Sequence, residues 1–219
     1  MTQARSDTAI AVLVGLAVKG RGPMTGYSRD RFGQAWSDTD RNGCDQRNDV
    51  LRGDLQQATL RAGTHGCVVM TGRLTDPYTG EVIAFTRASV PTSPVQIDHV
   101  VPLADAWVKG ASRWSLSQRT AFANDPLNLV AVGAKVNAQK GAGDAATWLP
   151  PARGYRCAYV ARQVAVKAKY HLSVTSAERA ALAQVLTTCP ATAVPTARVA
   201  PLGGWPTYQG PAPPPGPSR

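Results

Sequence analysis

The order of apolar runs between residues 95 and 144 constrains the fold of this chain more than any other feature. Residues 95–99, VQIDH, have the pattern of a buried strand whose last two residues are Asp98 and His99. Residues 127–132, LNLVAV, read as a second short strand, and residues 133–144, GAKVNAQKGAGD, as a short helix broken by glycines. The sequence therefore predicts strand, long loop, strand and helix in the middle of the chain.

Further elements are predicted on both sides of this unit. The apolar run 9–18 predicts a packed N-terminal helix, and the alternative is a vestigial secretion signal. The run is too short to span a bilayer. Residues 45–60 have helical spacing, and residues 67–87 predict a β-hairpin around the turn DPYTG. Residues 157–170 and 175–186 predict a helical hairpin, whose second helix opens with a capping box from Thr175 to Glu178.

These elements indicate an α+β protein with one folded domain. We expect residues 1–22 to be an N-terminal helical segment or vestigial signal, and residues 23–190 to form the domain. Residues 191–219 are so rich in proline and glycine that they cannot bury a core, which predicts a disordered tail.

The chain is strongly basic, and this charge favours a polyanionic partner. Its 219 residues include 24 Lys and Arg against 14 Asp and Glu, a net charge of +10. The basic residues are spread along the chain and form no basic tail, so the fold must assemble any binding surface. Nucleic acid, an anionic wall polymer and a membrane surface all suit this charge.

The four cysteines have no metal-binding spacing and predict two disulfides, which indicates an oxidising compartment. Cys157 lies at the start of the first helix of the predicted helical hairpin, and Cys189 lies at the end of the second. In an antiparallel hairpin these two helix ends are adjacent, so the two cysteines can pair. This pairing leaves Cys44 for Cys67.

The motifs DH-x-x-PL, NDPLNL and N-x-x-KG, at residues 98–103, 124–129 and 137–141, resemble those of the HNH nucleases, the ββα-metal superfamily. The stretches VKGRGPMTGYSRDRFGQAW, DRNGCDQRNDVL and GDAATWLPP resemble small, mostly secreted bacterial HNH-family proteins related to the C-terminal nuclease domain of modification-dependent restriction enzymes. The likeness runs from about Leu13 to Pro190. It implies a ββα-metal core and a divalent-metal-dependent endonuclease.

Phosphodiester hydrolysis needs a base that activates water and a cation that neutralises developing charge, and the motif residues suit both roles. The imidazole of His99 suits the base. Asp98 and Asn137 offer one carboxylate and one amide oxygen, a set of hard oxygen ligands that fits Mg²⁺ or Mn²⁺. The resemblance implies that Asn128 ties the loop between the two strands to the base. Lys140 is a candidate phosphate contact or a solvated lysine at a helix end.

Residues 38–49, DTDRNGCDQRND, match an EF-hand loop at positions one, three, five and six, but their twelfth residue is Asp49 in place of glutamate. Two interpretations stay open. The loop binds Ca²⁺, or it is an Asx-rich turn, fixed by Cys44, that caps the next helix. In either case Arg47 is a candidate contact for phosphate, with a helix-surface arginine as the alternative.

Taken together, the residues and the resemblance predict an endonuclease that acts on DNA, with RNA not excluded, and that is extracellular or at the cell surface. The alternative is a non-catalytic, calcium-stabilised basic module that binds a surface or wall. No pattern in the sequence indicates a membrane span or a protein partner. His65 and His171 have no acidic neighbour at ligand spacing, and we expect no role for them in the site.

Overall fold

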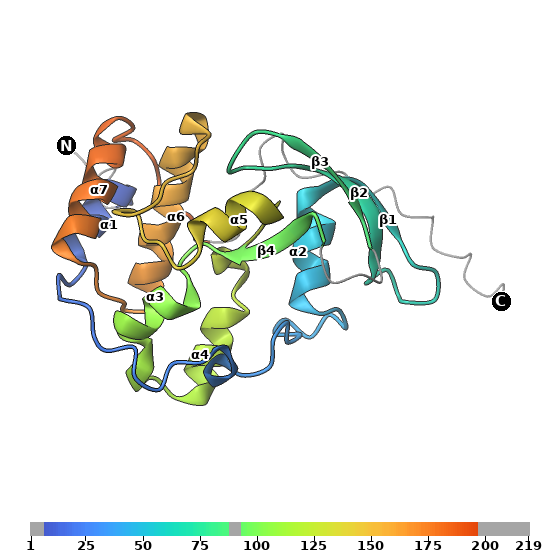
Figure 1. Ribbon diagram of the computed structural model, residues 1–219, viewed down its shortest axis with the longest axis horizontal. Coiled ribbons are helices and arrows are strands. Elements are labelled where there is room, and N and C mark those ends of the chain that lie inside the picture. Colours follow the sequence, from blue (N-terminus) through green and yellow to red (C-terminus); the bar gives the residue numbers. More distant parts are fainter. Residues whose placement is uncertain (1–6, 88–92, 197–219) are drawn as a thin grey trace, which may run out of the picture.

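A computed structural model of the protein describes residues 7–87 and 93–196. Its elements form an α+β arrangement in which a helical cluster and a small antiparallel sheet lie at opposite ends, with a two-stranded unit between them (Figure 1). The predicted fold class is confirmed. The proline-rich segment at 197–219 lies outside the described residues, so the predicted tail stays a prediction for most of its length.

The central unit has the predicted order. β4 (Val95–His99) pairs antiparallel with β5 (Leu129–Gly133), and α5 (Ala134–Lys140) follows directly. The long loop between the strands holds four short helices: α3 (Leu103–Val108), η3 (Ala111–Arg113), α4 (Leu116–Ala123) and η4 (Pro126–Asn128). β5 is buried on both faces, because Val130 and Val132 pack in one core with the helical cluster while Leu129 and Ala131 pack in another with the outer sheet. α5 ends at Gly141, whose φ of +52° favours glycine.

The outer sheet contains the predicted hairpin and one strand that was not predicted. β1 (Leu55–Leu60), β2 (Val69–Thr75) and β3 (Val82–Thr86) form an antiparallel sheet in that order. The carboxylate of Asp76 fixes the hairpin turn, since it accepts hydrogen bonds from the Tyr78 amide and the Thr79 hydroxyl. The predicted turn DPYTG is therefore confirmed.

The predicted helix at 45–60 is wrong in its second half. α2 spans Gln46–Asp54, capped by the Asp45 side chain, and the chain then continues as β1. The extended segment pairs with β2, from Leu55 opposite Leu74 to Leu60 opposite Val69. Pairing with a distant strand overrides the local helical spacing of this segment.

The helical cluster consists of α1 (Ala9–Gly15), α6 (Arg156–Lys169) and α7 (Ser176–Thr187), with η5 (Arg153–Tyr155) leading into α6. α1 contacts both α6 and α7, and Ala9 and Leu13 are buried among them, so residues 9–15 form a packed helix as expected. The remaining short helix is η2 (Arg29–Phe32). No helix within the described residues is long and apolar enough to cross a membrane.

Two disulfides join the predicted partners. Cys157 at the start of α6 is bonded to Cys189 after α7, and Cys44 before α2 is bonded to Cys67 before β2. The first links the open ends of the helical hairpin. The second links the loop before α2 to the outer sheet.

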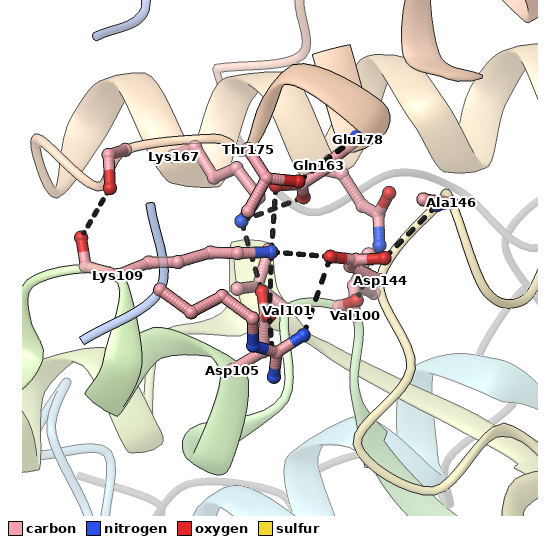
Figure 2. Close-up of polar contacts among 12 residues, drawn as sticks. Val100, Val101, Asp105, Lys109, Asp144, Ala146, Gln163, Lys167, Thr175 and Glu178 are labelled. Atoms are coloured by element: carbon pink, nitrogen blue, oxygen red, sulfur yellow. Dashed lines mark hydrogen bonds and ion pairs between the residues drawn. The ribbon is translucent and has the colours of Figure 1, made fainter. Parts of the chain in front are cut away.

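A buried cluster of charged side chains joins α3, α6 and α7 (Figure 2). The Lys109 ammonium lies 2.6–2.7 Å from carboxylate oxygens of Asp105, Asp144 and Glu178, and the Lys167 ammonium lies within 3.1 Å of Asp105 and Glu178. Burial alone would lower the pKa of Lys109, but the neighbouring carboxylates outweigh it and raise that pKa. The cluster therefore connects α3, α6 and α7 to the segment that follows α5.

The predicted capping box of α7 forms only in part. The Thr175 hydroxyl accepts a hydrogen bond from the Glu178 amide, as predicted. The Glu178 carboxylate instead faces the lysines of the buried cluster. Two ammonium groups in a buried site attract a carboxylate more strongly than one backbone N–H does.

Candidate active site

A cavity of about 470 Å³ opens where β4 ends, and residues from several parts of the chain line it. Asp98 and His99 come from β4 and Asn137 from α5. Arg47 comes from α2. The segment before α2 adds Arg29 and Trp36, which the sequence analysis did not single out. Four of the candidate site residues, Arg47, Asp98, His99 and Asn137, therefore share one cavity.

The imidazole of His99 is fixed by a backbone carbonyl. Its Nε2 lies 2.8 Å from the oxygen of Ala123, the last residue of α4. A carbonyl only accepts hydrogen bonds, so Nε2 carries the proton and Nδ1 is left with a lone pair in the neutral ring. Burial lowers the pKa of His99 to about 4, and the hydrogen bond to Ala123 opposes that shift. His99 is therefore a neutral acceptor at physiological pH.

Trp36 packs against the ring of the candidate base. The two rings are stacked, with centroids 6.3 Å apart and planes 14° apart. The backbone of Trp36 has φ +60°, an uncommon conformation for a bulky residue. The next residue is held in place, since the Ser37 amide donates to Oδ1 of buried Asn124 at 2.9 Å. No pattern in the sequence around Trp36 predicts its contact with His99.

Asp98 lies on the other side of the end of β4, where a lysine and a tyrosine hold its carboxylate. The Lys140 ammonium lies 2.9 Å from both carboxylate oxygens, and the Tyr78 hydroxyl donates to Oδ2 at 2.6 Å. Lys140 also donates to the His99 carbonyl at 2.9 Å. Lys140 is therefore buried against Asp98 and does not line the cavity, so it is not a solvated lysine.

Asn137 stands at the edge of the same cavity. Its Nδ2 donates to Oε1 of Gln96 at 2.8 Å, a contact that joins α5 to β4. Because the amide nitrogen is directed to Gln96, the Oδ1 atom remains as the group that Asn137 offers to a ligand. Both Gln96 and Asn137 line the cavity.

Asn128 is fully buried and bonds to the loop between the two strands. Its Oδ1 accepts from the Val101 amide at 2.8 Å, and its Nδ2 donates to the Val101 carbonyl at 3.2 Å. Its own carbonyl accepts from the Val100 amide at 2.8 Å. Asn128 makes no hydrogen bond to the ring of His99. It fixes Val100 and Val101, the two residues that follow His99.

The two remaining histidines lie away from this cavity. His65 and His171 are exposed, and neither belongs to its wall. Two tryptophans act in packing: Trp107 is buried against Tyr27 and Phe32, and Trp148 packs on Tyr78.

The cavity offers few protein ligands for a metal ion. Among the described residues, no group of three or more His, Cys, Asp or Glu side chains is arranged to hold a metal. Asp98 and Asn137 nevertheless supply one carboxylate and one amide oxygen to one cavity, which is the donor chemistry of Mg²⁺ and Mn²⁺. The residues fit a hard cation that takes most of its ligands from water and phosphate.

A comparison with protein families finds a match over more than half of the chain. Residues 45–185 match the family described as GmrSD restriction endonucleases, C-terminal domain. The chain belongs to this family. The matched range contains Asp98, His99, Asn128 and Asn137, and it excludes Trp36 and the start of the 38–49 loop.

One relative extends the likeness beyond the family range. An uncharacterized secreted protein of Arthroderma benhamiae is 42% identical over 186 residues, which cover 84% of this chain and 86% of the relative. No solved structure matches the chain. This member of the family therefore resembles a secreted protein over most of its length.

Proposed function

We propose that this family member is a divalent-metal-dependent endonuclease that hydrolyses phosphodiester bonds in DNA, with His99 as the general base. The single observation that carries the proposal is the hydrogen bond between Nε2 of His99 and the Ala123 carbonyl. It gives the ring one tautomer with Nδ1 unprotonated, and His99 lines the cavity that Asp98 and Asn137 also line. A base positioned in this way contributes about 10²- to 10⁴-fold to a rate.

His99 begins the reaction by accepting a proton from a water molecule at Nδ1. The water oxygen forms a bond to phosphorus while the bond from phosphorus to the leaving oxygen breaks, and that oxygen takes up a proton from solvent. If the leaving oxygen is O3′, the products carry a 5′-phosphate and a 3′-hydroxyl, as the family resemblance implies. The imidazolium that forms then returns its proton to solvent.

Three residues hold the base in position for this step. The Ala123 carbonyl orients the ring, Trp36 packs on its face, and Asn128 fixes the backbone immediately after β4. Arginine suits the binding of phosphate oxygens because its planar group donates several hydrogen bonds. Arg29 and Arg47 in the cavity wall are therefore proposed as substrate contacts.

Asp98 and Asn137 would hold the metal ion, which supplies charge neutralisation at the phosphate and the leaving oxygen. Lys140 neutralises part of the Asp98 charge and fixes the position of its carboxylate. Tyr78 donates a second hydrogen bond to the same group, and burial together with the Asp98 charge raises the pKa of Tyr78 well above its usual value. With one carboxylate already paired to a lysine, metal affinity is expected to be weak until substrate phosphate adds its own oxygens.

The test is a nicking assay on supercoiled plasmid, with Mg²⁺ or Mn²⁺ and with excess EDTA, using purified wild-type protein. We expect cleavage with metal and none with EDTA. A parallel assay on single-stranded RNA separates a DNA enzyme from a general nuclease. Absence of cleavage on both substrates with either metal would support the non-catalytic binding module.

We also propose that the protein acts outside the cytoplasm. Two disulfides join all four cysteines, and such bonds persist in oxidising compartments. The secreted relative supports the same location. Peptide mapping of protein isolated from its natural source, without reductant, tests whether both bonds are present.

A further inference from the structure

A second cavity, of about 500 Å³, lies beside the loop at 38–49 and is lined by oxygen-bearing side chains. Asp40, Asn42, Gln46 and Asp49 all belong to its wall. This donor set contains two carboxylates and two side-chain amides, and none of these residues lines the catalytic cavity. Carboxylate and amide oxygens are the ligands that calcium takes in proteins.

The two carboxylates of this cavity are held side by side. The Asn42 Nδ2 atom lies 3.0 Å from Oδ2 of Asp40 and 3.2 Å from Oδ2 of Asp49. The loop therefore already brings residues three and twelve of the calcium-binding pattern together.

An independent observation is the side chain of Gln46, the first residue of α2. Gln46 is 1% exposed, its Nε2 donates to the Thr39 hydroxyl at 3.0 Å, and its Oε1 has no hydrogen-bond partner. A buried amide oxygen without a partner is destabilising unless a donor or a cation reaches it. In the calcium-binding pattern Gln46 stands at position nine, which supplies a ligand directly or through water.

The charges of the loop also favour a bound cation. Asp38, Asp40 and Asp49 place three carboxylates in this loop, and among them Asp49 is paired with the Arg52 guanidinium at 3.3 Å. Asp38 accepts hydrogen bonds from the backbone amides of Asn42 and Gly43, at 3.1 and 2.9 Å, and so shapes the loop. Three acidic groups repel one another here, and a divalent cation would relieve that repulsion.

We propose that the loop at 38–49 binds one calcium ion, with Asp40, Asp49 and the Oε1 atom of Gln46 among its ligands. The disulfide from Cys44 to Cys67 anchors this loop to the outer sheet. Arg47 follows Gln46 in α2 and lines the catalytic cavity, so calcium would order the end of the helix that presents this arginine. The site is separate from the proposed catalytic metal.

Calorimetric titration of the chelator-treated full chain with CaCl₂ and with MgCl₂ tests the proposal. The range should extend to about 10 mM, because calcium sites of extracellular modules bind at about 10⁻⁴–10⁻³ M. We expect one calcium site, with magnesium at least tenfold weaker at that site. Calcium should also raise the midpoint of thermal unfolding, since it binds the folded chain alone.

Variants assign the site to the loop. Asp49→Asn and Gln46→Ala should each weaken calcium binding at least tenfold. Glu81→Gln, which removes an exposed carboxylate from the hairpin turn, and Asn137→Ala, which alters the catalytic cavity, should leave calcium affinity unchanged. Near-ultraviolet circular dichroism shows whether each variant is folded.

Two results would overturn the proposal. One is a wild-type chain that shows neither saturable heat nor a thermal shift with calcium. The other is calcium binding that survives both loop variants but is lost in Asn137→Ala, which would assign the ion to the catalytic cavity. Because the first result is read from the wild-type chain, a loop variant that fails to fold does not prevent the test.

Discussion

The Nε2 atom of His99 lies 2.8 Å from the carbonyl oxygen of Ala123, 24 residues further along the chain. This contact joins the end of β4 to the end of α4, and it decides which ring nitrogen of the histidine is free. Trp36 packs on the same ring from a third segment. The proposed base is thus positioned by parts of the chain that are not its neighbours in sequence.

His99→Ala should lower plasmid cleavage by about 10²- to 10⁴-fold, because the base acts on water and contributes little to binding of the duplex. DNA affinity, measured by fluorescence anisotropy, should remain near the wild-type value. His171→Ala is the matched control, since His171 is exposed and lies outside the cavity. Full nicking activity in a folded His99→Ala protein would remove His99 from the mechanism.

The pH dependence of cleavage should follow the lowered pKa of His99. A base acts in its deprotonated form, so the rate is retained above that pKa and falls as pH decreases through about 4. The measurement is kcat/KM from pH 3.5 to 8, with circular dichroism at each pH to confirm that the protein is folded. A decline centred near 6.5 would instead indicate a solvated, unperturbed histidine.

Asn137→Ala should raise the Mg²⁺ or Mn²⁺ concentration needed for half-maximal cleavage and leave stability almost unchanged, because the residue lies at the cavity edge. Asp98→Ala should raise the same requirement, but it also leaves the buried Lys140 ammonium without its carboxylate, which costs about 3–5 kcal/mol. Urea unfolding separates these two effects. Cleavage that is unaffected by EDTA would contradict both assignments.

DNA affinity should fall steeply with salt and depend little on base sequence, because phosphate contacts release bound counterions. In Arg47→Ala the slope of log affinity against log salt should be smaller by about one. Arg61→Ala is a suitable control, since Arg61 is exposed and does not line the cavity. Equal slopes in the two variants would place Arg47 away from the bound phosphates.

The buried ion cluster should contribute strongly to stability. Lys167→Met removes one ammonium that lies within 3.1 Å of Asp105 and Glu178, and leaving these buried carboxylates short of a partner costs about 3–5 kcal/mol. Lys169→Met, two residues away, breaks a half-exposed pair with Asp125 and should cost at most about 1 kcal/mol. Chemical denaturation of the two variants measures the difference. Similar values would show that the buried cluster is no more stabilising than the surface pair.

The sequence by itself determined the order of the elements around the site. Apolar periodicity and turn residues predicted β4, β5, α5 and both hairpins, and the positions of the cysteines within those elements predicted both disulfides. These features are local, because they depend on side-chain spacing within one segment and on where a helix or strand ends. The candidate residues Asp98, His99 and Asn137 came from the resemblance of their motifs to those of the HNH nucleases, and all three line one cavity.

Only the tertiary structure decided which groups meet. Residues 55–60 have helical spacing, but pairing with β2 makes them a strand. Lys140 is buried beside Asp98, and Trp36 lies against His99, because packing brings together segments that are 42 and 63 residues apart. Such partners are selected by the shape and charge of the assembled core, and a single sequence carries no local pattern that marks them.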